Sequence, residues 1–280
     1  MLIRLLTLLA LVVLATTAHA DQNQSAYDRV IKSGVIRCAY GSTAPYLYKD
    51  QKSGDIKGLY AEILAEAAKL LSLKIDYTEE PGFAEFPEGL RNGRYDAFCA
   101  PIGIVPSRAR VSMTAIPIVY HPQFIYVRKD DHRFKTLNDL NQATVTMATT
   151  DGEAMQLMTR RFLPKAKEYS LANSTPPAQL MMDVAVNKAD AVLHDPVYVT
   201  FFNRDNPDQS LVRAFAQPVS LTPGSTFTVA PGETALLNMM NVALQTLHDN
   251  GKIEEILTKY NIGPDVLYRI KPRYQDPQGK

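Results

Sequence analysis

The chain has 280 residues, with 30 lysine and arginine residues against 29 aspartate and glutamate residues, two cysteines and no tryptophan. This length suffices for one large or two smaller domains with a sizeable core. A formal charge of +1 gives no strong field that would attract nucleic acid or an anionic membrane. A composition of 46% hydrophobic and 21% charged residues argues against a disordered chain. What remains is a soluble globular protein. Two cysteines are too few for a small fold held together mainly by disulfide bonds.

Residues 1–20 have the pattern of a secretory signal peptide. Arg4 provides a positive charge, residues 5–15 are apolar except for Thr7, and Ala18-His19-Ala20 supplies small residues at the cleavage positions. An apolar run of this length is too short to span a membrane, which needs about 20 residues. We therefore expect residues 1–20 to be a signal peptide cleaved after Ala20. Loss of Arg4 would leave 29 basic and 29 acidic residues.

Strands and helices alternate through the first part of the remaining chain. We expect helices over residues 26–32, 58–71 and 86–91, and strands over residues 34–40, 74–77 and 96–100. In the helix over residues 58–71, the apolar residues Leu59, Ile63 and Ala67 fall on one stripe. This alternation predicts an α/β fold with a parallel sheet.

A second α/β series follows. We expect strands over residues 143–148, 191–194 and 226–230, helices over residues 153–162 and 178–187, and a long helix through residues 236–247 that Gly251 ends. Residues 205–208 and 218–224 have the composition of loops. The sequence therefore predicts two α/β halves, without a closer internal repeat.

Six short segments, in this order and spacing, resemble periplasmic solute-binding proteins of ABC transporters. They are Ala44-Pro45-Tyr46, Gly58-Leu59-Tyr60-Ala61-Glu62, Gly93-Arg94-Tyr95-Asp96, Pro106-Ser107-Arg108-Ala109-Arg110, Val127-Arg128-Lys129-Asp130 and residues 243–260. The resemblance covers residues 30–263 and is to the type II fold, in the polar amino acid-binding family (family 3). It implies two lobes, each a mixed, mostly parallel sheet flanked by helices, with a ligand cleft between them. Lobe 1 would be residues 21–124 and 225–280, and lobe 2 residues 125–224.

The resemblance also assigns the two ends of a ligand. Arg108 would hold a carboxylate, because a planar guanidinium can grip one through two parallel hydrogen bonds. Asp195, which follows the expected strand over residues 191–194, would pair with an ammonium group. The alternatives are a surface arginine in a basic turn with Arg110, and an aspartate that caps the turn into Pro196.

Aromatic residues would line the cleft, and some positions depart from the family pattern. Tyr46 and Phe83 match positions that form the walls, and Tyr40 stands where the family often has an acidic residue. Each of these three side chains could instead be core packing.

Two further departures affect the polar groups. Gly103 replaces the usual serine or threonine five residues before the arginine, and Thr150-Asp151-Gly152 replaces a Gly-Thr-Thr segment whose N–H groups would favour an anion. Asp151 would repel a carboxylate there. The amino-acid site is therefore half present, and a ligand with a cationic or neutral group near Asp151 fits equally well.

Cys38 and Cys99 lie near the ends of strands that are neighbours in this fold. The distance between adjacent strands, about 4.8 Å, suits the Cα separation of a disulfide. In an oxidising compartment we expect a Cys38–Cys99 bridge, with two buried free thiols as the alternative.

The resemblance implies a monomeric receptor, not an enzyme, that closes in the periplasm on a small polar solute, an amino acid or a related amine or organic acid, and delivers it to an ABC permease. We expect no cofactor and no metal, since His121, His132, His194 and His248 show no ligand spacing. Phosphate-binding and nucleophile motifs are also absent from the sequence. One alternative is an enzyme of the same fold that dehydrates cyclohexadienyl acids, with Glu85, Asp151 or Asp195 as its acid. The other is a sensor that docks on a membrane receptor.

Overall fold

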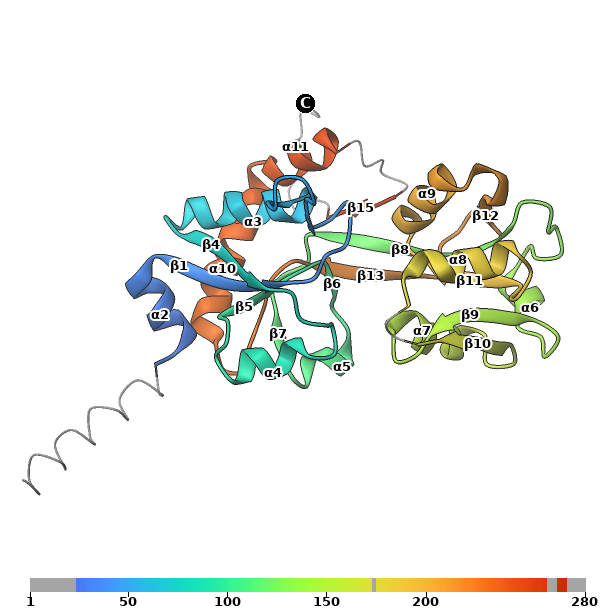
Figure 1. Ribbon diagram of the computed structural model, residues 1–280, viewed down its shortest axis with the longest axis horizontal. Helices are drawn as coiled ribbons and strands as arrows, with labels where there is room; N and C mark the ends of the chain where they lie inside the picture. The colour runs from blue at the N-terminus through green and yellow to red at the C-terminus, as the bar shows by residue number, and fades with distance from the viewer. Residues whose placement is uncertain (1–23, 173–174, 261–265, 271–280) are drawn as a thin grey trace, which may run out of the picture. The chain divides into compact units, whose positions relative to one another are not determined.

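The computed structural model describes residues 24–172, 175–260 and 266–270, so the predicted signal peptide lies outside the described residues. The chain forms two compact units (Figure 1). The first unit contains the described residues up to Ile102 together with Pro106–Ile116 and Ser225–Ile256. The second contains Gly103–Val105, Pro117–Gly224 and the described residues from Leu257 onward. The predicted lobe boundaries stay a prediction.

The first unit is built on a five-stranded sheet. In spatial order its strands are β4 (Lys74–Glu79), β1 (Val35–Tyr40), β5 (Ala97–Cys99), β14 (Thr228–Val229) and β7 (Met113–Thr114). β4, β1 and β5 are parallel, and β14 is antiparallel to both of its neighbours. The carboxyl ends of the three parallel strands therefore meet at one edge of the sheet.

Helices flank this sheet. They are α2 (Ala26–Ser33), α3 (Leu59–Leu70), α4 (Phe86–Arg91), α5 (Pro106–Ala109) and α10 (Thr234–Asp249), with α11 (Lys252–Lys259) after α10. A small hairpin of β2 (Tyr48–Lys49) and β3 (Ile56–Lys57) precedes α3. The expected stop of the long helix is confirmed: α10 ends two residues before Gly251, whose φ of 77° is a conformation that glycine adopts without strain.

The second unit repeats the strand order of the first. Its sheet runs β10 (Lys167–Leu171), β9 (Thr146–Thr150), β11 (Ala191–His194), β8 (Val119–Arg128), β13 (Ser220–Ser225) and β6 (Ile102–Gly103). β12 (Leu211–Arg213) and β15 (Tyr268–Arg269) also pair with β8. In both sheets the first parallel strand lies between the second and third, and an antiparallel strand follows the third. The prediction of two α/β halves is confirmed.

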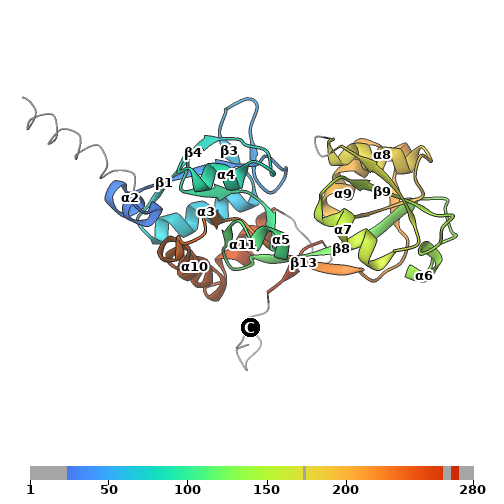
Figure 2. The same cartoon turned by 90° about the horizontal axis from the view of Figure 1, so that it is seen from below.

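Two apolar layers cover the faces of the second sheet. Because side chains alternate along a strand, Phe124 and Tyr126 of β8 pack on one face and Ile125 and Val127 on the other. α8 (Pro177–Ala185) and α9 (Pro196–Asp205) cover the first face, while α6 (Leu137–Leu140) and α7 (Ala154–Phe162) cover the second (Figures 1 and 2). The short helix η1 (Pro207–Gln209) follows α9.

One expectation about the second half is wrong. Residues 218–224 were expected to form a loop, but β13 (Ser220–Ser225) is a strand that pairs with residues 119–123 of β8. Pro223 and Gly224 suggest a turn because proline cannot donate to a ladder. The strand tolerates Pro223 because its carbonyl still accepts a hydrogen bond from the N–H of Ile104 at 2.9 Å.

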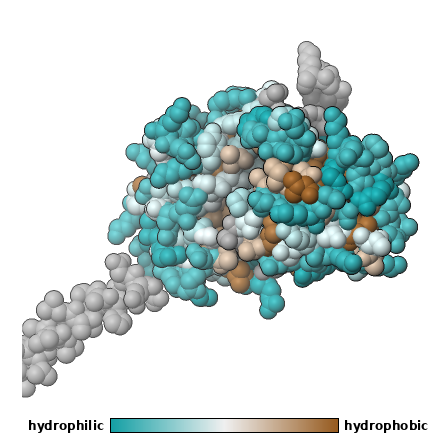
Figure 3. Space-filling view, turned by 45° about the vertical axis from the view of Figure 1, so that its right-hand side comes forward, coloured by the Kyte–Doolittle hydropathy of each residue, from teal (hydrophilic) through white to brown (hydrophobic). Residues whose placement is uncertain are grey.

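The surface has the character of a folded protein with an internal core. The face in Figure 3 is mainly hydrophilic, with small hydrophobic areas between polar side chains. Among the described residues, no helix combines the length and the apolar character that a membrane span requires.

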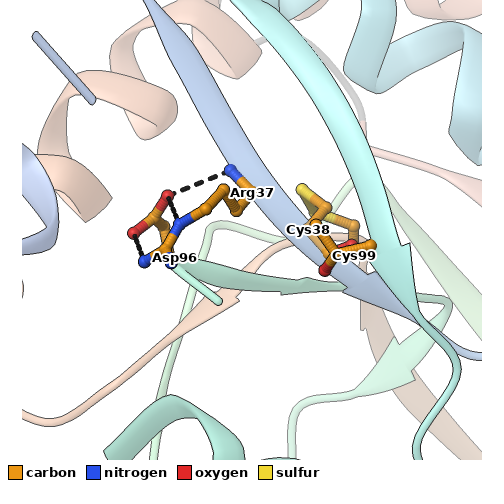
Figure 4. Close-up of a disulfide and its surroundings, with 5 residues drawn as sticks. Arg37, Cys38, Asp96 and Cys99 are labelled. Carbon is orange, nitrogen blue, oxygen red and sulfur yellow. Dashed lines mark hydrogen bonds and ion pairs between the residues drawn. A yellow bond between two sulfur atoms is a disulfide. The ribbon is translucent and has the colours of Figure 1, made fainter. Parts of the chain in front are cut away.

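A buried carboxylate ties the start of the first unit together. The Asp96 side chain is 1% exposed and accepts hydrogen bonds from Arg37 at 2.8 Å (Figure 4) and from Arg29 at 2.9 Å. It also accepts from the backbone N–H of Arg37 at 3.0 Å. Burial acts to raise the pKa of Asp96, but the bonds from Arg37 and Arg29 outweigh it and hold the pKa below its usual value. Asp96 therefore joins α2, β1 and the start of β5.

We predict that Asp96→Asn lowers the free energy of unfolding by about 2 to 3 kcal/mol, because the hydrogen bonds from two guanidinium groups lose their charged acceptor. Since the pKa of Asp96 is lower in the folded chain, its contribution is complete above the unfolded pKa of about 4 and is lost as the pH falls further. Urea unfolding from pH 7 to pH 3 checks this. Asp55→Asn, which changes an exposed carboxylate, should alter stability by less than about 0.5 kcal/mol. Equal acid sensitivity of the wild type and Asp96→Asn would contradict the assignment.

The two cysteines form the expected disulfide (Figure 4). The Cα atoms of Cys38 and Cys99 are 5.6 Å apart, and no other cysteine exists. In the register of β1 and β5, Cys38 lies opposite Ala97 and Cys99 opposite Tyr40. The two cysteines therefore share one face but lie diagonally across the strand pair, and the alternative of free thiols is wrong.

We predict that replacing both cysteines by serine destabilises the chain by up to about 4 kcal/mol, because the bridge closes a loop of 61 residues in the unfolded state. Thermal unfolding of the oxidised wild type and the double variant measures this. Dithiothreitol should lower the melting temperature of the wild type and leave that of the variant unchanged. A double variant as stable as the oxidised chain would show that the bridge does not stabilise the fold.

Candidate functional site

The predicted ligand-binding residues fall into two groups, one in each unit. Tyr40, Tyr46, Phe83 and Arg108 belong to the first unit, and Gly103, Thr150, Asp151 and Asp195 to the second. In the first unit Tyr40 ends β1 and Phe83 follows β4, and in the second Thr150 ends β9 and Asp195 follows β11, whereas Gly103 lies in β6. The two groups are therefore described as two half-sites.

Phe83 lies over the end of the first strand. A side-chain carbon at Gly41 would come within 3.0 Å of Cζ of the Phe83 ring, so glycine allows the ring to rest on the backbone that follows β1. The ring also meets Phe98 edge-to-face at a centroid distance of 5.6 Å. Phe83 is half-buried, and it keeps part of its surface exposed. It can therefore offer apolar contact area at this edge of the sheet.

The two tyrosines of the first half-site are buried. Tyr46 is 1% exposed and packs on Tyr60 at a centroid distance of 5.3 Å. Tyr40 meets the ring of Tyr77 edge-to-face, and burial, reinforced by the nearby charge of Glu80, raises the pKa of its hydroxyl. Both side chains therefore have a packing role in this structure, and contact with a ligand stays a prediction.

Arg108 lies in the short helix α5 and is half-buried. Its carbonyl accepts hydrogen bonds from the backbone N–H groups of Val111 and Ser112, each at 3.0 Å, and from the Ser112 hydroxyl at 3.1 Å. These bonds fix the backbone that carries the guanidinium, and Arg110 on the same turn is exposed. Arg108 thus has a hydrogen-bonded backbone and a partly accessible side chain. Its contact with a carboxylate stays a prediction.

In the second unit, the Thr150-Asp151-Gly152 turn is closed by a side chain that the sequence reasoning missed. The backbone N–H of Gly152 donates to Oε1 of Gln156 at 3.0 Å. Nε2 of Gln156 donates to Asp151 at 3.2 Å and to Ser170 at 3.1 Å, and the Ser170 hydroxyl also donates to Asp151. Gln156 is 3% exposed, so a polar residue on the inner face of α7 was the available signal.

This network changes the interpretation of the turn. The N–H of Gly152, one of the donors that an anion would need, is already bonded within the unit. The Asp151 carboxylate receives two hydrogen bonds from the same network. Its charge is therefore partly compensated, and the turn is held in place by its own helix. Repulsion of a carboxylate by Asp151 stays a prediction.

Asp195 caps helix α9 and bonds to a buried histidine. Its Oδ1 accepts from the backbone N–H of Val197 at 2.7 Å, as an N-cap aspartate does. Its Oδ2 lies 2.5 Å from Nδ1 of His121, and the two side chains are 8% and 11% exposed. The capping role, which was the alternative interpretation of Asp195, is thus present, and His121 was not predicted as its partner. A histidine in a strand 74 residues away leaves no local signal.

Other polar groups surround this pair. The backbone N–H of Asp195 donates to Nδ1 of His194 at 3.0 Å, and the His194 ring packs edge-to-face on Tyr198 at 4.8 Å. Burial lowers the pKa of His194, so this second imidazole is neutral near pH 7. On β12 the guanidinium of Arg213 stacks on the ring of Phe124 at 3.8 Å.

The chain belongs to the bacterial extracellular solute-binding proteins, family 3, whose model matches residues 36–263. The expected family is therefore confirmed.

Two relatives are similar over nearly the whole chain. A probable amino-acid ABC transporter-binding protein of Haemophilus influenzae is 24% identical, over 90% of this chain and 93% of its own. The L-cystine-binding protein TcyA of Bacillus subtilis is 22% identical, over 95% of this chain and 98% of its own. The cyclohexadienyl dehydratase of Pseudomonas aeruginosa is 24% identical, over 77% of this chain and 81% of its own. Binding proteins predominate among these relatives, and one enzyme is present.

Solved structures agree on the fold. A putative ABC transporter binding component of Wolinella succinogenes in complex with lysine has a TM-score of 0.71 at 20% identity, covering 82% of this chain and 97% of its own. An ancestral amino acid-binding protein, a precursor of cyclohexadienyl dehydratase, has a TM-score of 0.69 at 24% identity, covering 84% of this chain and 99% of its own. The expected two-lobed fold of type II is confirmed.

Among the described residues, no group of three or more histidine, cysteine, aspartate or glutamate side chains is arranged to hold a metal ion.

Proposed function

We propose that the chain is an exported receptor that binds a small polar solute with a carboxylate group, an amino acid or a related organic acid, and delivers it to an ABC permease. The single observation that carries this proposal is the family match over residues 36–263. Arg108 supports it, because a fixed backbone and a partly accessible guanidinium suit bidentate binding of a carboxylate. The relatives that bind amino acids support the same class of solute.

The proposal also covers the location of the chain, its oligomeric state and its division into two lobes. The predicted signal peptide over residues 1–20 would place the mature, monomeric chain in the periplasm. Residues 21–124 with 225–280, and residues 125–224, would be the two lobes. A solute that contacts both lobes would favour the closed state by its differential affinity.

Transport rather than catalysis is proposed because binding proteins predominate among the relatives reported above. Of the carboxylates considered as an acid catalyst, Asp195 already receives hydrogen bonds from His121 and Val197. A dehydratase would convert its ligand, whereas a receptor returns it unchanged.

We predict that a carboxylate solute raises the melting temperature of the wild type in a thermal-shift screen of amino acids, amines and organic acids, because a ligand stabilises the folded state that binds it. Arg108→Ala should weaken binding of that solute by at least about tenfold, since the charge-assisted hydrogen bonds to its carboxylate are lost. Isothermal titration calorimetry measures this loss. Arg110→Ala, on the same turn, is the matched control and should bind as the wild type does.

Three results would contradict the proposal in different ways. Full affinity in Arg108→Ala would remove Arg108 from the site. Turnover of the solute, seen by chromatography after incubation, would assign an enzyme. No stabilisation by any of the tested classes would contradict the receptor itself.

A further inference from the structure

We propose that Glu80 and Phe83 form a subsite in the first unit for a cationic group of the solute, an ammonium or a guanidinium group. The solute is then a basic amino acid or a related cationic acid. This inference rests on the proposed function, because it names the class of solute that the receptor takes. The resemblance does not predict Glu80 as a binding residue, and Tyr40 stands where the family often has an acidic residue.

Glu80 is an exposed carboxylate that two neutral donors hold in place. It follows β4, the neighbour of β1, and the backbone N–H of Ser42 after β1 donates to its Oε1 at 3.1 Å. Burial, and then the charge and hydrogen bond of Glu80, raise the pKa of the Tyr40 hydroxyl, which therefore stays protonated at neutral pH and donates to the carboxylate. Since a carboxylate has about four acceptor positions, Glu80 can accept further hydrogen bonds from a ligand.

The aromatic ring of Phe83 lies at the same loop. The ring rests on Gly41, and Glu80 bonds to the next residue, Ser42. Edge-to-face packing on Phe98 positions the ring, which stays partly exposed. A cation at this place gains from the carboxylate through a charge-assisted hydrogen bond and from the ring through a cation–π contact. An anion gains from neither group.

The cationic side chains nearest in sequence are already paired. From the last residue of β4 to the start of β5 the chain has four glutamates and two arginines. Arg94 pairs with Glu79 at 3.5 Å, and Arg91 pairs with Glu88. Within the part of the chain that the structure describes, Glu80 forms no ion pair. Its negative charge is therefore left for a ligand to balance.

The Asp151 carboxylate of the second unit favours the same charge. Its hydrogen-bond donors, Gln156 and Ser170, are neutral, so they stabilise its charge without cancelling it. The guanidinium of Arg160, which interacts with the charge of Asp151, is bonded to Glu168 at 2.7 Å. Each half-site thus presents a carboxylate whose charge a cationic solute can balance.

The test compares pairs of solutes that differ in charge at one group. Arginine and citrulline, lysine and norleucine, and 5-aminopentanoate and pentanoate each exchange a cationic group for a neutral one. Calorimetry at pH 7 should show that the wild type binds the cationic member of the pair it accepts at least about tenfold more tightly than the neutral member.

Two variants then locate the source of this preference. Glu80→Gln should reduce the ratio of the two affinities at least about fivefold, because the amide oxygen can still accept from Ser42 but carries no charge. Glu79→Gln is the matched control: it removes the same charge one residue away, from a carboxylate that is paired with Arg94. This control should keep the wild-type ratio.

Each outcome has a separate meaning. A wild type that binds the neutral member as tightly as the cationic one, or that accepts only other solutes of the screen, overturns the subsite and leaves the receptor function intact. A preference for the cation that Glu80→Gln keeps in full, or that Glu79→Gln reduces equally, also overturns the subsite. A wild type that binds no solute at all contradicts the proposed function and this inference with it. The wild-type ratio alone decides the inference if Glu80→Gln does not fold.

Discussion

A carboxylate that is taken out of water requires hydrogen bonds or a positive charge close to it, and Asp195 receives hydrogen bonds within its own unit. His121 approaches one oxygen and the N–H of Val197 the other. Because of this constraint, the end of β11, the start of α9 and the middle of β8 are held at one place.

Another buried carboxylate, that of Asp96, satisfies the same constraint with different partners. Asp96 is surrounded by Arg29 and Arg37, two permanently charged groups, and it joins elements of the first unit. His121 differs from an arginine because an imidazole can lose its charge near neutral pH. The arginine pair therefore suits a structural bond.

The sequence predicts the fold well because its signals are local. Apolar periodicity located α3 and α10, and Gly251 marked the end of the long helix. The strand β13 was missed because Pro223 and Gly224 have the local signature of a turn, while its pairing with β8 depends on residues about 100 positions away. Cys38 and Cys99 could be paired only through a resemblance that places their strands side by side.

The site is less predictable than the fold for the same physical reason. Arg108 and Asp195 stand in recognisable motifs, but the residues that set their surroundings do not. His121 reaches Asp195 across 74 residues of sequence, and Gln156 closes the turn at Asp151 and Gly152 from inside a helix. Such partners are determined by strand register and helix packing, which a motif does not contain.

The central claim is that His121 holds the Asp195 carboxylate in the chain without ligand. Nitrogen-15 NMR of histidine-labelled protein tests it most directly, because the chemical shift of Nδ1 reports whether that atom carries a proton. The structure predicts a protonated, slowly exchanging Nδ1 at His121 at neutral pH, and a changed Nδ1 signal in Asp195→Asn. A His121 signal that titrates and exchanges like that of the exposed His132, and that is unaffected by Asp195→Asn, would contradict it.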